Sequence, residues 1–319
     1  MVKKINQTFT IPEEHANERL DQALAKLLSD FSRTQIKTWI ENNQVTVNGQ
    51  RCKSKLRLKG GELVNIEADL IPQLSWEAQN LPLEIIYEDE ALLIINKPIG
   101  LVVHPGAGNK DKTLLNALLY HIPALRDLPR AGILHRLDKD TSGLLMVAKT
   151  PGALKKLGHQ LKKRTVLREY QAVVYGKIIS GGTIDAPMSR HPMQRKKMAV
   201  STAEIAKPAI THYRVLEKYP AHTRLKIQLE TGRTHQIRVH MAHIHHPVVG
   251  DSTYARLQLT KNITPELAQF LRQFKRQALH AYVLGLTHPT TGELMRFEID
   301  LPDDLKQFIS ILKQDRDRK

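Results

Sequence analysis

Apolar residues recur at helical or alternating spacing along the chain, beginning with a compact N-terminal region. From Glu18 to Leu28, leucine and alanine return every three or four residues, which predicts an amphipathic helix. A second helix is expected after Ser32, a residue type that caps helices, and residues 44–49 alternate as a short strand ending in an Asn-Gly turn. Two more short strands are expected around residues 60–61. The pattern predicts a unit of two helices and a small sheet.

This pattern divides the chain into five segments. Residues 1–17 are expected to form a flexible arm or an edge strand before the small domain, which we place at residues 18–70. Residues 71–82 contain two prolines, show no period, and are predicted to be a linker. A second domain is predicted over residues 83–305, followed by a C-terminal helix or charged, frayed tail over residues 306–319.

Within the second domain, helical and alternating segments are mixed. A helix is expected at residues 113–121, and a basic amphipathic helix at residues 151–163. Paired strands are expected at residues 210–217 and 223–230, where apolar and polar residues alternate. Residues 256–276 are polar and are interpreted as an insertion or a peripheral helix.

A polar loop lies between two apolar segments near the middle of the chain. Ile133 and Leu134 lead into it, and residues 144–148 leave it as an apolar run suited to a buried strand. Between them, Arg136 and Asp138 place a cation and a carboxylate two residues apart. A polar surface turn is the plain alternative, but flanking buried strands would hold such a loop rigidly. We therefore treat this loop as the candidate for chemistry.

Charge adds a second indication. The 319 residues include 48 Lys and Arg against 32 Asp and Glu, a formal net charge of +16, which favours a polyanion partner over a merely solvated basic face. A membrane partner is weaker, because no basic amphipathic anchor and no long apolar run are present. Cys52 is the single cysteine, and no signal-peptide pattern opens the chain, so we expect a cytoplasmic protein, with monomer as the default.

A second polar cluster spans residues 231–251 and is expected to begin a helix near Thr234. Its histidines invite a metal interpretation, with His240 and His243 at helical spacing, but zinc sites usually add Cys or carboxylate ligands in recognisable patterns. A serine hydrolase using Ser142 lacks the Gly-x-Ser-x-Gly turn. Walker and Rossmann glycine patterns are also missing, so no metal and no cofactor are expected.

The N-terminal unit resembles an S4 domain, a small RNA-binding module. The resemblance rests on four segments: Arg19-Leu-Asp, Ser32-Arg-Thr-Gln-Ile-Lys, Val45-Thr-Val-Asn-Gly and Gly60-Gly-Glu. It departs mildly from the usual pattern at Asn43 and Glu62. A basic face would contact phosphates without reading sequence. Its outward-facing residues are expected to be Arg33, Lys37, Arg51, Lys53, Lys55 and Arg57.

The second domain resembles the RluA family of RNA pseudouridine synthases. The motifs are Asn96-Lys-Pro-Ile-Gly-Leu-Val-Val-His-Pro, His135-Arg-Leu-Asp-Lys-Asp-Thr-Ser-Gly-Leu, Arg168-Glu-Tyr, Thr231-Gly-Arg-Thr-His-Gln-Ile-Arg and Gln277-Ala-Leu-His-Ala. The resemblance implies an α+β fold around a central mixed, largely antiparallel sheet flanked by helices and loops. Val103-His-Pro-Gly-Ala-Gly and Leu128-Pro-Arg-Ala-Gly-Ile look most like D-type members, with the S4-bearing C-type members as the nearest alternative.

The resemblance also implies three catalytic roles. Asp138 would be the nucleophile that lets uracil detach from the ribose; spacing alone could not choose it over Asp140. Arg238 would pair with Asp138 and keep it ionised. Tyr170 would stack on the base near the carbon that loses a proton. Without the resemblance, Tyr170 would be an ordinary core aromatic and Arg238 an ordinary surface cation.

Further contacts are expected around these three residues. Arg136 would enter the RNA and fill the gap left by the flipped uridine, and Ile237 would form an apolar wall of the base pocket. Arg233 and His235 would contact RNA. The implied reaction is conversion of uridine to pseudouridine in 23S ribosomal RNA, in the stem-loop at the subunit interface, with an assembling large subunit as partner. A non-catalytic RNA-binding ribosome-assembly factor is the alternative from another class, and metal-dependent RNA hydrolysis is a third.

Overall fold

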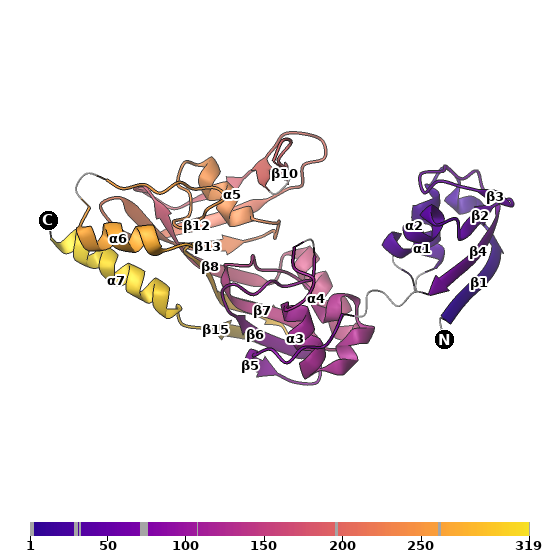
Figure 1. Cartoon of the computed structure of the whole chain (residues 1–319), viewed down its shortest axis with the longest axis horizontal. Helices are drawn as coiled ribbons and strands as arrows, with labels where there is room; N and C mark the ends of the chain where they lie inside the picture. Colours follow the sequence, from indigo (N-terminus) through magenta and orange to yellow (C-terminus); the bar gives the residue numbers. More distant parts are fainter. Residues whose placement is uncertain are drawn as a thin grey trace. The chain divides into compact units, whose positions relative to one another are not determined.

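The computed structural model describes residues 3–28, 31, 33–70, 76–106, 108–194, 197–260 and 263–318. The chain divides into two compact units, Met1–Ser75 and Trp76–Lys319. Figure 1 labels the elements of each. Of the expected linker, residues 71–75 lie outside the described part. Residues 76–82 belong to the second unit, where the Asn116 side chain donates to the carbonyl of Glu77 at 2.8 Å.

The first unit is a four-stranded sheet with two helices, as the apolar pattern indicated. The sheet order is β1-β4-β2-β3. Its core contains buried aliphatic side chains from both helices and the sheet, among them Leu24, Ile36 and Ile66. The bounds are β1 Lys3–Thr10, α1 Leu20–Leu27, α2 Arg33–Glu41, β2 Val45–Val47, β3 Gln50–Arg51 and β4 Leu63–Leu70, with a short 3-10 turn, η1, at Glu13–His15.

Of the two alternatives for the N-terminal residues, the edge strand is confirmed over residues 3–10, because β1 pairs with β4 along its whole length at the edge of the sheet. One expectation for this unit needs correction. Only one strand, β4, forms around residues 60–61. The residues before it instead bond to the start of α1: Leu20 N donates to the Leu56 carbonyl at 2.8 Å, and Leu58 N to the Glu18 carbonyl at 3.0 Å. Ser32, the expected helix cap, lies outside the described residues.

The second unit is built on a mixed, largely antiparallel sheet, as expected. The path is β5-β6-β7-β14-β8-β13-β12-β9, with β15 also pairing with β14. The β14–β7 pair is parallel, and the other pairs of this sheet are antiparallel. The strands are β5 Glu84–Glu88, β6 Leu92–Lys97, β7 Ser142–Ala148, β8 Leu167–Tyr175, β9 Gly182–Asp185, β12 Ile210–Lys218, β13 His222–Leu229, β14 Leu279–Thr287 and β15 Leu294–Glu298. A separate hairpin pairs β10 Met188–Arg190 with β11 Met198–Val200.

Helices cover both faces of β6 and β7, which explains why these strands are continuously apolar. Leu93 and Leu145 share a core with residues of α3, whereas Leu92 and Leu144 share one with residues of α4. A side-chain and backbone capping box between Thr113 and Asn116 begins α3. The helices are α3 Leu114–His121, α4 Pro151–Lys163, α5 Gln236–His243, α6 Pro265–Gln273 and α7 Asp303–Asp317, with 3-10 turns η2 Pro123–Asp127 and η3 Pro129–Gly132.

The C-terminal segments are more integrated than the sequence pattern indicated. Phe308 of α7 stacks on Phe270 of α6 with ring centroids 5.1 Å apart, and Leu312 is fully buried. Beyond the expected fraying point, the buried Asp315 carboxylate accepts a hydrogen bond from Thr264 N at 2.9 Å. The polar segment and the charged tail therefore pack together against the core. Among the described residues, no helix has the length and apolar character to cross a membrane.

Gly143 gives a test of the β7–β14 contact that roots the central loop. Its φ is +119°, and a Cβ there would lie 2.1 Å from the Ala281 carbonyl oxygen. We expect Gly143→Ala to lower the free energy of unfolding by at least about 2 kcal/mol, measured by urea denaturation. Gly152→Ala is the matched control, because no atom lies within 4 Å of its Cβ position in α4. Equal stability of the two variants would contradict this packing.

Candidate active site

Asp138 lies in the loop between η3 and β7, and hydrogen bonds fasten this loop to the sheet. Thr141 N donates to the Asp138 carbonyl at 3.1 Å, closing a turn around the residue. The Gln277 amide donates to Thr141 Oγ1 at 3.0 Å, and Ser142 Oγ lies 2.8 Å from Nδ1 of His280. Residues 277–280, at the start of β14, therefore hold the loop in place.

Lys97, the last residue of β6, also holds this loop in place. Its fully buried ammonium donates to the carbonyls of Pro98 at 2.6 Å, Leu101 at 3.0 Å and Lys139 at 3.1 Å. Burial lowers the pKa of Lys97 to about 8, although the charges of Asp140 and Asp138 oppose that shift. The three carbonyls match the three protons of the ammonium, so the end of β6 is tied to the loop.

Arg238 on α5 bridges two carboxylates. Its Nη1 donates to Asp138 Oδ2 at 2.9 Å. On its other edge, Nε donates to Asp251 Oδ2 at 2.6 Å and Nη2 to Asp251 Oδ1 at 2.8 Å. Burial opposes the charge, but the hydrogen bonds and charges of Asp251 and Asp138 outweigh it and raise the pKa of Arg238. The guanidinium is thus fixed by Asp251 with Nη1 aimed at Asp138.

Tyr254 and His235 enclose this ion pair. The guanidinium carbon of Arg238 lies 5.1 Å from the centroid of the Tyr254 ring. The Tyr254 hydroxyl lies 2.8 Å from His235 Nδ1, and His235 Nε2 is 4.0 Å from Asp138 Oδ1. Burial lowers the pKa of His235, against the charge of Asp138. His235 therefore contacts the catalytic candidate as well as facing the cavity.

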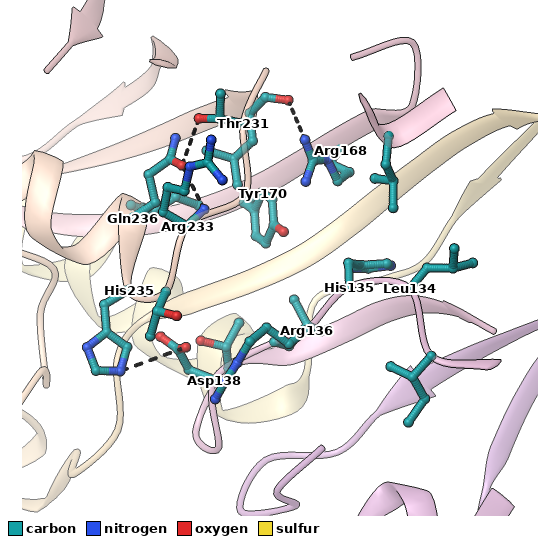
Figure 2. Close-up of a pocket in the computed structure, with 18 of the residues that line it drawn as sticks. Leu134, His135, Arg136, Asp138, Arg168, Tyr170, Thr231, Arg233, His235 and Gln236 are labelled. Carbon is teal, nitrogen blue, oxygen red and sulfur yellow. Dashed lines mark hydrogen bonds and ion pairs between the residues drawn. The ribbon is translucent and has the colours of Figure 1, made fainter. Parts of the chain in front are cut away.

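A cavity of about 860 Å³ opens over Asp138, whose side chain is 15% exposed. Tyr170 and Ile237, both buried, line it, and Figure 2 shows the Tyr170 ring projecting toward the loop that carries Arg136 and Asp138. Burial raises the pKa of Tyr170, so its hydroxyl keeps its proton at neutral pH. The structure thus brings the three expected catalytic residues and the expected apolar wall into one cavity.

The rest of the cavity lining is strongly basic. Arg136 is exposed, and the structure assigns it no ion pair among the described residues; Arg233 donates through Nε to the Pro208 carbonyl at 3.1 Å. Apart from Asp138, the acidic lining residue is Glu230, which already bonds His212 and Arg164. The cationic lining residues are Arg130, Arg136, Lys162, Arg164, Arg168, Arg233 and Arg238. Such a lining suits a polyanionic ligand.

Within the histidine cluster, His240 is used in packing. His240 is fully buried and hydrogen-bonded through both ring nitrogens, to Thr211 Oγ1 at 2.9 Å and to the Ala186 carbonyl at 3.0 Å. Over the described ranges, no group of three or more His, Cys, Asp or Glu side chains is placed to hold a metal ion.

In the first unit, the expected phosphate-binding face is only partly free. Arg33 donates through Nε at 3.0 Å and Nη2 at 2.7 Å to the buried Asp21, and Lys37 lies 3.3 Å from Glu41. Both side chains are exposed, as expected, but each is paired with a carboxylate, Arg33 with Asp21 and Lys37 with Glu41. A separate cavity of about 720 Å³ is lined by basic residues. The basic residues of this cavity are Arg51, Lys53, Lys55, Arg57 and Lys59.

Sequence reasoning missed Asp251 and Tyr254. Asp251 is the last residue of the polar cluster at residues 231–251. Its role depends on Arg238, thirteen residues earlier, which folds back onto it. The sequence signal that could have identified Asp251 is the Gly250-Asp251 pair, which follows two valines and is typical of a turn. Gly250 has φ +76°, and a Cβ there would lie 2.0 Å from the Arg276 carbonyl oxygen, so this turn requires glycine.

Comparison with known proteins agrees with this geometry. A family model for RNA pseudouridylate synthases matches residues 91–243, and an S4 domain model matches residues 18–64. The chain is 54% identical over 314 residues to a ribosomal large subunit pseudouridine synthase D of Pasteurella multocida, covering 98% of this chain and 96% of the relative. The corresponding Escherichia coli protein is 50% identical over 317 residues, covering 99% and 97%.

Two solved structures share the fold of most of this chain. The human RNA pseudouridylate synthase domain containing 4 superposes with a TM-score of 0.56 at 26% identity, covering 72% of this chain and 93% of that one. The human domain containing 1 protein gives 0.53 at 27% identity, covering 74% and 96%. The chain belongs to the RNA pseudouridine synthase family, a family of isomerases, and carries an S4 domain before its synthase domain.

Asp251 should position Arg238 rather than touch RNA. We expect Asp251→Asn to lower kcat for pseudouridine formation by about 10- to 100-fold, the equivalent of losing charge-assisted hydrogen bonds. Tritium release from RNA labelled at uracil C5 measures this rate. Asp304→Asn, which removes the carboxylate partner of Arg276 outside the cavity, is the matched control. Equal rates in the two variants would show that Asp251 has no particular role.

Proposed function

We propose that this chain converts uridines of large-subunit ribosomal RNA to pseudouridine, with Asp138 as the nucleophile. The observation that carries the proposal is the Asp138–Arg238 pair, which opens onto a basic cavity that also contains Tyr170. The names of the relatives support ribosomal RNA as the substrate. The D-type character of the motifs supports the 23S stem-loop at the subunit interface, within an assembling large subunit.

The reaction breaks the bond from ribose C1′ to uracil N1 and forms a bond from C1′ to C5. A proton leaves C5 and another ends on N1, so atoms balance without an oxidant or a phosphate donor. Asp138 provides the carboxylate oxygen that starts the exchange, and Arg238 orients it through the 2.9 Å hydrogen bond. Tyr170 offers a flat ring for the uracil, and Ile237 an apolar wall.

The target nucleotide must leave the RNA stack before this chemistry, at a cost of a few kcal/mol. Arg136, exposed at the cavity and without an ion pair among the described residues, is suited to occupy the space that the uridine vacates. Phosphate contacts from the cavity lining, including Arg233 and His235, and from the basic cavity of the first unit would offset the cost.

Asp138→Asn should abolish pseudouridine formation while leaving RNA affinity nearly unchanged, because the amide keeps the size of the side chain but is a poor nucleophile. Mapping pseudouridines in ribosomal RNA, together with filter binding, measures both effects. Asp140→Asn, two residues away in the same loop, is the control and should stay active. Pseudouridine formed by Asp138→Asn at the wild-type rate would refute the mechanism. Cells with Asp138→Asn that match wild type while deletion strains do not would favour a non-catalytic assembly factor.

The basic cavity of the first unit should add affinity without chemistry. The double variant Arg51→Gln, Lys53→Gln should weaken RNA binding and reduce the slope of log affinity against log salt by about one to two. The kcat at saturating RNA should be unchanged. The double variant Lys306→Gln, Lys313→Gln, on α7 of the second unit, is a charge-matched control. An unchanged salt slope would remove these two residues from the RNA interface.

A further inference from the structure

Arg168 is a buried cation in the cavity without a counter-charge. It lies on β8 and is 6% exposed. Its Nη2 donates to the backbone carbonyls of Glu230 at 3.1 Å and Leu229 at 3.4 Å. Its Nε is buried and has no hydrogen-bond partner among the described residues. Across the same residues, no carboxylate forms an ion pair with Arg168.

Such an arrangement is costly in an empty site, because a buried charge needs a partner to offset its lost hydration. Burial accordingly lowers the pKa of Arg168. The neighbouring acids are already engaged: Glu169 with Lys226 at 2.7 Å, and Glu230 with Arg164 at 2.9 Å. His135 cannot assist, because burial and the charge of Arg168 lower the pKa of His135 to about 3.

The backbone leaves room for this guanidinium. A Cβ on Gly232 would lie 2.6 Å from Arg168 Nη1, so a side chain at position 232 would displace the arginine. The two carbonyls and this gap fix where the guanidinium lies. Arg168 is two residues before Tyr170 on the same strand, and alternate residues of a strand share a face. The free donors therefore lie beside the tyrosine ring in the cavity.

Figure 2 shows the Tyr170 ring between Asp138 and Arg168. A nucleotide whose C1′ meets Asp138 and whose base stacks on Tyr170 would extend its uracil edge toward Arg168. That edge carries carbonyl oxygens. When the C1′–N1 bond breaks, its electron pair goes to the uracil, and the negative charge spreads from N1 onto those oxygens. A fixed cation in a desolvated site stabilises such developing charge well.

We propose that Arg168 is a further catalytic residue, which donates a hydrogen bond to a uracil carbonyl oxygen and stabilises the departing uracil anion. This inference rests on the proposed function of Asp138. It adds a positive charge at the opposite end of the base from Arg238, whose guanidinium is held by Asp138 and Asp251.

Arg168→Gln should lower kcat about 10²- to 10³-fold, the usual cost of removing one oxyanion donor, with RNA affinity nearly unchanged. Arg168→Lys should recover part of the rate, because it restores the charge. Arg224→Gln is the matched control: Arg224 lies on the neighbouring strand β13, outside the cavity, and donates to Gln171. An Arg168→Gln enzyme with wild-type kcat would overturn the inference, provided that wild type itself makes pseudouridine. Inactive wild type would instead count against the proposed function.

Gly232→Ala provides a second route if Arg168→Gln folds poorly. The new methyl group meets only the end of a flexible side chain, so the fold should be kept while the guanidinium moves. We expect a loss of kcat in the same direction as Arg168→Gln, with an unchanged melting temperature. Full activity in Gly232→Ala together with a displaced guanidinium would contradict the inference.

Substrate analogues identify the atom that Arg168 contacts. RNAs carrying 2-thiouridine or 4-thiouridine at the target replace one carbonyl oxygen by sulfur, a weaker acceptor. If Arg168 binds that oxygen, the loss caused by Arg168→Gln should shrink with the matching analogue, as a double-mutant cycle requires. If Arg168→Gln lowers the rate by the same factor with uridine, 2-thiouridine and 4-thiouridine at the target, the proposal is overturned. Coupling instead to a methylphosphonate beside the target would assign Arg168 to a phosphate and also overturn it.

Discussion

The site depends on one guanidinium held between two carboxylates. Asp251 binds two nitrogens of Arg238, and this leaves Nη1 directed at Asp138. Each of the three charges would be costly to bury alone, and the guanidinium offsets that cost for both carboxylates. The Asp138 carboxylate is therefore oriented by a residue one hundred positions away, and that residue is oriented by a turn which only glycine at position 250 permits.

Around this trio, whose two carboxylates and one guanidinium leave a single negative charge, the cavity lining keeps an excess of positive charge. Glu230 is the other acid of the lining, and it is already bonded to His212 and Arg164. The excess therefore faces the ligand. An excess of positive charge is expected for a site that receives a phosphodiester chain. Under the proposed function, exposed cations such as Arg136 would attract the chain, whereas the buried Arg238 would act on Asp138.

Local patterns predicted the elements that local interactions determine. The bounds of α4 match the expected helix at residues 151–163, because Thr150, Pro151 and the apolar stripe are signals within one segment. The pairing of β12 with β13 could be predicted for the same reason, because the alternation of apolar and polar residues lies within each strand. Patterns that depend on distant partners failed: residues 56–58 bond to the start of α1 instead of forming a strand, and the charged end of α7 needed Thr264.

The candidate site likewise contains residues that local sequence patterns identify and residues that depend on distant partners. The polar loop was identifiable from its setting between buried strands, but spacing could not distinguish Asp138 from Asp140, and the family resemblance decided it. The structure supplies the physical difference, since Asp138 reaches Arg238. Tyr254 and the isolated charge of Arg168 had no local signal, and Asp251 had only the Gly250-Asp251 pair, because the roles of these residues come from what surrounds them after folding.

The division into two units has a consequence for how such proteins diversify. Each unit has its own hydrophobic core, and the lining of the catalytic cavity begins at Trp76. Replacement of the N-terminal module would thus leave the residues that line this cavity in place. Selection can therefore alter one unit without rebuilding the other.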